Sequence, residues 1–540
     1  MSRGVVGLGA GQLLRMIGRL RASGFAVDVA VAAILLALAL SLRLAWLQAD
    51  PPVASLGRLG NLQISGVFLT DEGWYSRNAR IHALEGTWTQ PGDLNPIAIT
   101  PLFSAMQRVA FEISGVSLIA ARTGPALLGG LAPAVLFVLL RRPLGRPFAM
   151  VGALLLATDF TSVMYSRLAL TEIPYITLLL TSAALLLVAR RHASHGLAAG
   201  SACVGLLAIG FKLSAVSLTL VVIVDAVFVA VVLGFRYRGG AALSPVALAF
   251  TWAATLAAGA TIFFASWVEP FGEDAAWLTS RLLGQRLGGV GAMVRGYAVF
   301  LQDGVPWHHW PILFPLGLGG SLWVLAMACR HAVSGRFQRG PPGTIFEMPP
   351  VEVRFLALWL LVSTAGVASL SYQPLRYFLI LVPSMAGLAA IALQQLWRRG
   401  PLLRVTAALT LGAAIAISAF DYVAWAAHPR YSLLETAHSI GRRARADTPR
   451  PVICGRIADT LALENRLPTV NLPIGRPLEY IGPRLRRYPP THLLLLDGAE
   501  LPRLSVRYPE TFGRASPIGS FELLKNYYTA EPVRLLRLEH

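Results

Sequence analysis

Long apolar blocks alternate with short polar segments over the first 425 residues of the chain. A helix of about 20 apolar residues crosses the ~30 Å hydrocarbon core of a bilayer. The blocks therefore predict a polytopic α-helical membrane protein with eleven transmembrane helices. The expected spans are 26–48, 116–140, 148–165, 170–189, 196–211, 214–234, 246–267, 311–329, 355–371, 376–396 and 403–425.

Arginine clusters between these blocks predict the orientation of the chain. Cytoplasmic loops carry an excess of Lys and Arg. With the N-terminus inside, alternate loops hold the clusters Arg141/Arg142/Arg146, Arg190/Arg191, Arg236/Arg238, Arg330/Arg336/Arg339 and Arg398/Arg399/Arg404. All five clusters lie on the cytoplasmic side only if the segment 196–234 forms two helices, turning at "FKLS". The loops 49–115 and 268–310 and everything after residue 426 then lie outside.

The first outer loop, 49–115, carries two amphipathic patterns. "WYSRNARIHALEG" and "PLFSAMQRVAFEISG" both space apolar residues as a helix does, and "QPGDLNP" between them is typical of a turn. We expect two juxtamembrane helices that lie along the outer membrane surface with their apolar faces toward the lipid.

The last 110 residues have a different character. Short apolar runs such as "PVICG" and "THLLLLDG" alternate with helical patterns such as "YSLLETAHSIGRRARA" and "DTLALENR". None of these runs is long enough to span a bilayer, and the alternation is typical of a small α/β domain. The sequence thus predicts a transmembrane domain over 1–429 and a soluble extracytoplasmic domain over 430–540.

Composition excludes two other classes of protein. The formal charge is +19, but only 14% of residues are charged, and the arginines form short clusters between apolar blocks instead of a continuous basic surface. Membrane orientation explains them better than nucleic-acid binding does. The cysteines, Cys203, Cys329 and Cys454, are too far apart in sequence to suggest a disulfide framework.

Ionisable residues bordering apolar spans converge on the predicted outer face. Such residues are candidates for function, because charge is costly next to the membrane. They occur after the first span, around the turn "SRLALTEIPY", at the turn in 196–234 and at the start of the tenth span: Asp71 and Glu72; Asp159, Arg167 and Glu172; Lys212; Arg376. Helix capping explains any one of them, but a shared site explains the set.

Two adjacent histidines, His308 and His309 in "VPWHHWP", are additional candidates. They offer ligands for a divalent metal. Histidines flanked by tryptophan are also typical of an interfacial anchor, and this alternative stays open. No other cofactor is indicated by the sequence.

Sugar transfer from a polyprenyl-phosphate donor would use this combination of groups. The leaving phosphate needs Arg or Lys to hold its charge. The acceptor hydroxyl needs a carboxylate that takes its proton as the oxygen attacks the anomeric carbon. A carboxylate also stabilises an oxocarbenium-like transition state.

The chain resembles the GT-C membrane glycosyltransferases, in particular the bacterial enzymes similar to protein O-mannosyltransferases and to the aminoarabinose transferase of lipid A. The resemblance is carried by "DEGWYSRNA", "NPIAITPLF", "AARTGPALLGGLAPAVLFVLLRRPLG" and "MYSRLALTEIPY", mainly within 71–190, and more loosely by "GFKLSA" and "PLRYFLILVPSMAGLAA". It implies a GT-C fold and a lipid-linked sugar donor. Asp159 stands where the family usually has proline, which leaves open whether it joins the site.

Roles follow for individual residues. The resemblance implies that Asp71 is the general base, that Glu72 positions the acceptor or tunes the base, and that Glu172 is the acid of the second outer loop. The topology adds Arg167, Lys212 and Arg376 as candidates for holding the donor phosphate. The expected partners are the bilayer, a polyprenyl-phosphate sugar and a glycan, lipid or protein acceptor.

A transporter or lipid flippase is the main alternative. Such proteins are expected to place ionisable groups near the bilayer midplane, often on broken helices in two related halves. The sequence shows no such duplication. A noncatalytic envelope scaffold is a further alternative, and it would tolerate the loss of Asp71.

Overall fold

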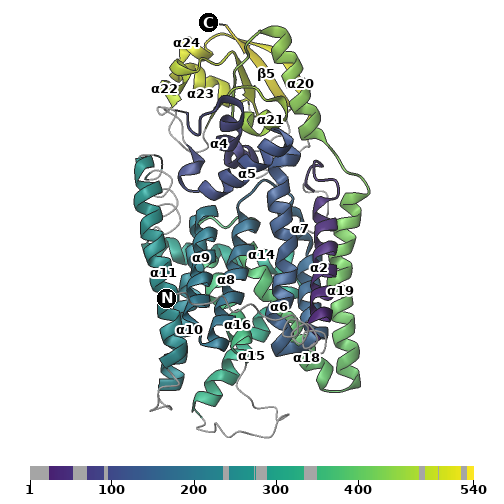
Figure 1. The fold of residues 1–540 in the computed structure, drawn as a ribbon. Helices are drawn as coiled ribbons and strands as arrows, with labels where there is room; N and C mark the ends of the chain where they lie inside the picture. Colours follow the sequence, from purple (N-terminus) through teal and green to yellow (C-terminus); the bar gives the residue numbers. More distant parts are fainter. Residues whose placement is uncertain are drawn as a thin grey trace, which may run out of the picture.

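A computed structural model describes residues 24–52, 70–90, 95–234, 243–272, 274, 276, 289–333, 350–472, 481–496, 498–523 and 532–539. A bundle of long helices occupies one part of the molecule, and a small domain that contains the C-terminus lies at one end of it (Figure 1). We call this end of the bundle the domain-side end, and the opposite one the far end.

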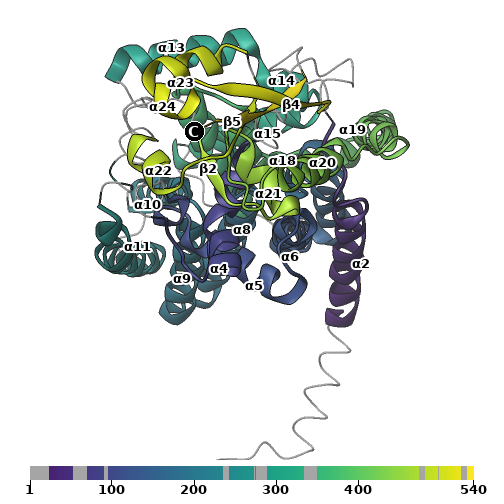
Figure 2. The same ribbon diagram turned by 90° about the horizontal axis from the view of Figure 1, so that it is seen from above.

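The bundle consists of apolar helices that pack side by side. Its long helices are α2 (Phe25–Leu44), α6 (Leu118–Thr158), α8 (Glu172–His192), α9 (His195–Phe211), α10 (Ser217–Gly234), α11 (Leu243–Phe263), α15 (Leu313–Val333), α16 (Val351–Ala368), α18 (Val382–Arg398) and α19 (Pro401–Ala426). Viewed from above, α2, α11 and α19 lie at the periphery (Figure 2). Only 6% of the most apolar window of α19 is buried, against 89% for the segment Leu375–Arg398 that ends with α18, as expected for lipid-facing and central helices.

The eleven predicted spans all have helical counterparts. Within the described residues, nine helices are long and apolar enough to cross a membrane. One of them, α6, contains two spans, because the backbone leaves helical geometry at Gly145 (φ 73°, ψ 165°). The shorter α9 supplies the remaining span and ends at Lys212, whose extended backbone (φ −162°, ψ 127°) makes the turn predicted at "FKLS". The chain is a multi-pass membrane protein.

Short helices lie among or above the ends of the long ones. They are α4 (Glu72–Glu85), η2 (Pro96–Ala98), α5 (Pro101–Ser114), α7 (Phe160–Ser166), η3 (Leu213–Val216), η5 (Phe264–Val268), η6 (Glu269–Phe271), α13 (Gly289–Asp303), α14 (Val305–His309), α17 (Leu375–Phe378) and η7 (Leu379–Leu381). The two predicted juxtamembrane helices are α4 and α5. Val109 and Ile113 of α5 are exposed, whereas most of α4 is covered, because the C-terminal domain packs on it.

The C-terminal domain is an α/β layer structure. Its elements are α20 (Ser432–Asp447), β1 (Ile453–Gly455), α21 (Ala458–Asn465), β2 (Thr469–Asn471), α22 (Gly482–Arg487), β3 (His492–Leu495), α23 (Glu500–Arg507), α24 (Pro509–Phe512), β4 (Ala515–Phe521) and β5 (Val533–Leu538). The described strands form one sheet in the order β2-β1-β3-β5-β4. The pairs β1/β2 and β1/β3 are parallel, and β3/β5 and β4/β5 are antiparallel.

A polar clamp anchors this domain to the bundle. The side chain of Asp50, just after α2, accepts hydrogen bonds from Ser432 N (2.7 Å), Ser432 Oγ (2.8 Å) and Leu433 N (3.3 Å). It thereby satisfies amides at the start of α20 that have no partner within the helix. The indole N–H of Trp425 donates to the Asp50 carbonyl at 2.9 Å. The end of α2, the end of α19 and the start of α20 are thus joined.

Buried ion pairs join helices toward the far end. Asp225, on α10, contacts Arg190 of α8 and lies 3.0 Å from Arg354 Nε of α16. The carboxylate is fully buried. Charges in such a place are retained when they are paired. Asp225 therefore holds three spans together, a role that its position in the sequence "VVIVDAVFVAVV" does not reveal.

Candidate active site

Asp71 lies at the N-terminus of α4, on the domain-side end of the bundle. Its carboxylate forms an ion pair with Arg376, with Nη1 2.7 Å from Oδ2, and accepts a hydrogen bond from Thr70 Oγ1 at 3.2 Å. A quarter of the Asp71 side chain is exposed (25%), against 12% for Arg376. The carboxylate is therefore held by a cation and is still accessible.

Glu172 is the first residue of α8 and is the buried centre of the same cluster. Its Oε1 lies 2.5 Å from Lys212 Nζ and 3.3 Å from Arg376 Nε. The side chain is 1% exposed, so the two cations compensate its charge where water cannot. Lys212 reaches Glu172 because the backbone turns at the end of α9. Arg376 reaches Glu172 from α17, which begins directly after Pro374.

The cluster joins four segments that are far apart in the sequence. Asp71 comes from α4, Glu172 from α8, Lys212 from the break after α9 and Arg376 from α17. Aromatic rings border the cations: Lys212 Nζ is 5.3 Å from the ring centroid of Tyr377. Two carboxylates and two cations, each a candidate from the sequence, thus meet at one point.

Glu72, the neighbour of Asp71, points elsewhere. It is fully buried and receives two hydrogen bonds from Arg122, at 2.9 and 2.7 Å, and one from the Ala169 amide at 2.6 Å. Arg122 also donates to the carbonyls of Leu47 and Ala49, each at 3.0 Å. Glu72 therefore fixes the start of α4 against α6 and the end of α2, and supports Asp71 without contacting the other ion pairs.

Arg167 is engaged at the end of α2. Its guanidinium donates to the carbonyls of Arg43 (3.1 Å), Ala45 and Trp46 (2.5 Å), and it lies 4.3 Å from the ring centroid of Trp425. These carbonyls belong to the last turn of α2 and the residues that follow, where a cation is favourable. Both Nη atoms of Arg167 thus donate to backbone carbonyls, and no contact with the ion-pair cluster is seen within the described part of the chain; its phosphate role stays a prediction.

Asp159 caps a helix. It separates α6 from α7, and its carboxylate accepts from Ser162 N (2.8 Å) and from the indole N–H of Trp310 (2.8 Å). An Asp at an N-cap satisfies one of the free amides of the first turn. This accounts for an acidic residue at the position where the sequence pattern leads one to expect proline.

His308 and His309 lie on α14, and the ring of His309 is 6.0 Å from that of Trp310. Among the described residues, no group of three or more His, Cys, Asp or Glu side chains is arranged to hold a metal ion. The predicted metal role therefore has no ligand set in the described part of the chain. The neighbouring tryptophans fit the alternative role as an anchor.

An apolar groove of about 360 Å³ lies among the helices that carry part of the cluster. It is formed by α5, α6, α8 and α9, and its walls are Leu102, Ala105, Met106, Val109, Leu128, Leu178, Leu207 and Phe211. Phe211 immediately precedes Lys212. One wall residue of the groove is therefore the chain neighbour of a cation of the cluster.

Several residues that shape this region were not anticipated. In the sequence Arg122 is conspicuous only as part of the motif "AARTGPALLGG", although it is the partner of Glu72. On α4, Gly73, Arg77 and Arg80 contact the C-terminal domain. Their spacing of four and then three residues is that of one helix face, which is the signal that could have identified them.

Solved structures match the chain over most of its length. ArnT from Cupriavidus metallidurans in the apo state matches 96% of this chain and 98% of its own, with a TM-score of 0.57 at 16% identity. The same protein bound to undecaprenyl phosphate matches with a TM-score of 0.54 at 15% identity, over 95% and 98% of the two chains. The chain has the GT-C fold.

More distant comparisons agree with this fold. The archaeal oligosaccharyltransferase AglB from Archaeoglobus fulgidus, in complex with an inhibitory peptide and a dolichol-phosphate, matches 86% of this chain and 69% of its own, with a TM-score of 0.52 at 14% identity. Residues 96–267 match the family model for dolichyl-phosphate-mannose-protein mannosyltransferase. No curated protein matches the chain by sequence. The matched stretch includes Glu172 and Lys212, while Asp71 precedes it.

Proposed function

We propose that this chain is a glycosyltransferase that moves a hexosyl or pentosyl group from a polyprenyl-phosphate donor to a glycan, lipid or protein acceptor. The observation that carries the proposal is the cluster of Asp71, Glu172, Lys212 and Arg376, contributed by four segments at one end of a GT-C bundle. A purely structural ion pair needs two groups. Two cations and two carboxylates, one of them partly exposed, suit a reaction in which a donor phosphate binds and the acceptor hydroxyl gives up its proton.

Asp71 would serve as the general base. The acceptor hydroxyl oxygen attacks the anomeric carbon and forms the new C–O bond, while its proton passes to the Asp71 carboxylate. The bond from the anomeric carbon to the phosphate oxygen breaks, and polyprenyl phosphate departs with the electron pair. A positioned base contributes about 10²- to 10⁴-fold to such a step.

Lys212 and Arg376 would hold the phosphate. Both cations already lie within ion-pair distance of Glu172, which keeps them in place before the donor arrives. A buried carboxylate that pre-orients two cations reduces the reorganisation needed when phosphate binds. Arg167, Glu72 and Asp159 are left out of this assignment, because their polar atoms serve helix ends and packing.

The apolar groove supports a lipid-linked donor. A polyprenyl chain is uncharged and needs an apolar surface along which to lie. Phe211, which lines the groove, directly precedes Lys212, and we propose that a chain lying in the groove presents its phosphate to this lysine. The matching structure of ArnT was solved with undecaprenyl phosphate, a ligand of the same chemical class.

The reaction would take place on the extracytoplasmic face. Arg141 and Arg146 pair with Asp28 near the start of α2, at the far end of the bundle. Arg190 and Arg191 in the last turn of α8 and Arg398 in the last turn of α18 lie on the same side, whereas the predicted clusters Arg236/Arg238 and Arg336/Arg339 fall outside the described residues. By the positive-inside rule, the far end then faces the cytoplasm, and the site and the C-terminal domain face outward.

The test is donor turnover in membranes that contain the protein. A panel of radiolabelled polyprenyl-phosphate sugars is incubated with these membranes, and the free polyprenyl phosphate that appears is measured. The expected result is release with at least one sugar, reduced at least 100-fold in Asp71→Asn. Asp447→Asn, the same substitution in the C-terminal domain, should retain the wild-type rate, because Asp447 pairs with His492 and Arg537.

Two outcomes would contradict the proposal. If every donor is left intact by the wild type while the protein transports a labelled lipid across the bilayer, the chain is a flippase. If Asp71→Asn turns over as fast as the wild type, Asp71 is not the base.

A further inference from the structure

The helix that begins with Asp71 has a second face, which the proposed reaction does not use. Gly73, Arg77 and Arg80 share this face of α4 and point at the C-terminal domain, while Asp71 and Glu72 face the bundle. At a rise of about 1.5 Å per residue, Arg77 is ~9 Å along the helix from Asp71. The contacts made by this face therefore act close to the carboxylate.

Gly73 brings α4 into direct contact with α21. Its amide donates to Thr460 Oγ1 at 3.1 Å. A Cβ atom at this position would lie 2.1 Å from the backbone nitrogen of Thr460. No side-chain movement can relieve such an overlap, because the obstructing atom is backbone. Only glycine allows the two helices this separation.

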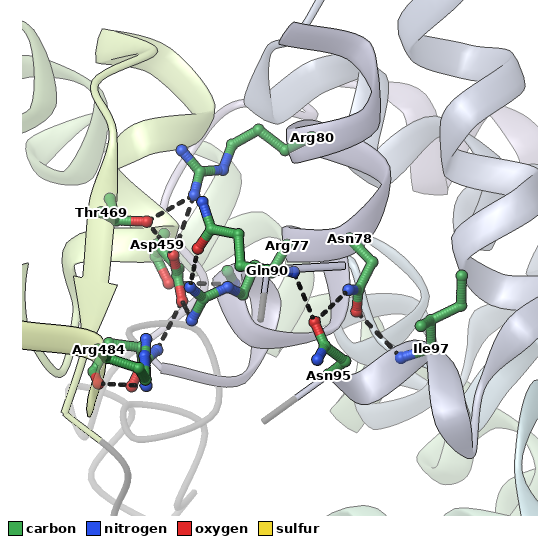
Figure 3. A network of polar contacts seen from close by, with 12 residues as sticks. Arg77, Asn78, Arg80, Gln90, Asn95, Ile97, Asp459, Thr469 and Arg484 are labelled. Carbon is green, nitrogen blue, oxygen red and sulfur yellow. Dashed lines mark hydrogen bonds and ion pairs between the residues drawn. The ribbon is translucent and has the colours of Figure 1, made fainter. Parts of the chain in front are cut away.

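Arg77 and Arg80 converge on one carboxylate, that of Asp459 in the first turn of α21 (Figure 3). Arg77 Nη1 is 3.4 Å from Asp459 Oδ2, and Arg80 Nη2 is 3.0 Å from Oδ1, with all three side chains at most 2% exposed. Burial alone would raise the pKa of Asp459, but the two guanidiniums and the hydrogen bonds from Thr469 and Asn471 outweigh it and lower the pKa. Asp459 is therefore ionised and compensates both arginines.

The same short helix, α21, also contacts α6. Glu464 accepts a hydrogen bond from the Leu118 amide at 2.7 Å, and Arg466 Nε donates to the Val116 carbonyl at 3.2 Å. Leu118 begins α6, the helix that carries Arg122 and thereby holds Glu72. Thus α21 fixes α4 directly and through the helix that clamps its first residue.

We propose that Asp459 and Gly73 are positioning residues for the transfer reaction. The C-terminal domain then contributes to catalysis, because its helix α21 positions Asp71. The proposal rests on the assigned role of Asp71 as base. A displacement of about 1 Å at a reacting group can lower a rate ~10²-fold. Loosening α4 should therefore slow the chemical step and leave the donor phosphate site, built from Lys212 and Arg376, intact.

The experiment compares Asp459→Asn with Asp447→Asn in the full-length protein. Both substitutions remove a paired carboxylate from the C-terminal domain, but only that of Asp459 pairs with arginines of α4. For Asp459→Asn we expect kcat to fall at least tenfold, with KM for the polyprenyl-phosphate sugar within twofold of the wild type. For Asp447→Asn both parameters should stay within twofold. If Asp459→Asn only reduced the amount of folded protein, the yield of monodisperse protein would fall by the same factor as the measured kcat.

A double-substitution cycle separates positioning from general damage. If Asp459 acts through Asp71, adding Asp459→Asn to Asp71→Asn leaves the residual single-turnover rate unchanged. If the two losses multiply, Asp459 does not act through the base and the inference is wrong. Asp71→Asn with a normal rate would instead refute the proposed function itself. These two failures are therefore distinguishable.

Gly73→Ala provides a second variant if Asp459→Asn does not fold. Alanine favours helix, so α4 itself is not weakened, but its Cβ must push α4 away from α21. We expect kcat to fall at least tenfold, with unchanged binding of polyprenyl phosphate and no further loss in the Asp71→Asn background. A Gly73→Ala protein with wild-type kcat would overturn the inference.

Discussion

The adjacent carboxylates Asp71 and Glu72 should respond to amide substitution in opposite ways. Glu72 is fully buried, with hydrogen bonds from Arg122 at 2.9 and 2.7 Å and from the Ala169 amide at 2.6 Å. Glu72→Gln leaves the buried guanidinium of Arg122 without a counter-charge. Breaking a buried ion pair in this way costs about 3 to 5 kcal/mol of folding free energy. Asp71 is 25% exposed, and its substitution should affect folding far less.

The effect on the reaction should be reversed. Removing a general base lowers kcat by about 10²- to 10⁴-fold, which corresponds to ~2.7 to 5.4 kcal/mol in the activation barrier. Asp71→Asn should therefore fold normally and lose activity. Glu72→Gln should be thermally labile, and the fraction that remains folded should lose about tenfold in rate, less than Asp71→Asn, because the base remains although the clamp on α4 is weakened.

Two measurements on the same samples test this contrast. The fraction of monodisperse protein is followed by gel filtration after heating at a series of temperatures, and the release of polyprenyl phosphate is expressed per folded molecule. Glu112→Gln serves as the control, because Glu112 is half exposed and pairs only across the surface of α5 with Arg108. If Glu72→Gln is as heat-stable as the control but lacks activity per folded molecule, Glu72 belongs to the chemistry and the division of roles argued here fails.

Three further predictions concern individual side chains. Lys212→Ala should weaken the binding of polyprenyl phosphate at least tenfold in a titration, because an ammonium beside the groove is lost, and unchanged affinity would refute the phosphate role. Arg167→Ala should lower the free energy of unfolding by about 2 to 3 kcal/mol without changing that affinity, since its hydrogen bonds go to backbone carbonyls. Cys454 should resist maleimide at pH 8 in a Cys203→Ser/Cys329→Ser background, because burial raises the pKa of its thiol to about 12; rapid labelling of folded protein would contradict this.

Hydrophobic periodicity was sufficient to predict the spans, because each helix needs its own ~20-residue apolar block to cross a bilayer. The alternation of the arginine clusters alone predicts the turn at Lys212. The break at Gly145 falls between the predicted spans 116–140 and 148–165. Periodicity could not predict that helical structure would continue up to this one positive-φ residue and resume directly after it, without a loop. The ends of a span can be predicted from the residues around them, whereas the joining of two spans into one helix cannot.

The candidate site was predictable for a different reason. A charge beside an apolar span is costly, so Asp71, Glu172, Lys212 and Arg376 were conspicuous one by one, and the structure brings these four together. The same criterion also selected Arg167 and Asp159, whose charges serve helix ends instead. Sequence alone cannot separate the two cases, because both kinds of residue border apolar spans and differ only in which groups lie opposite.

Arg77, Arg80 and Asp459 escaped prediction because their partners are nearly 400 residues apart in the sequence and none of them borders a span. Yet α4 cannot be positioned by the bundle alone. Its first residue is clamped by Arg122 on one side, but a helix held at one end can still tilt. The contacts of Gly73 and Arg80 with α21 supply the second point of attachment. Two attachments on different faces define the direction of the helix, so the position of Asp71 depends on both domains at once.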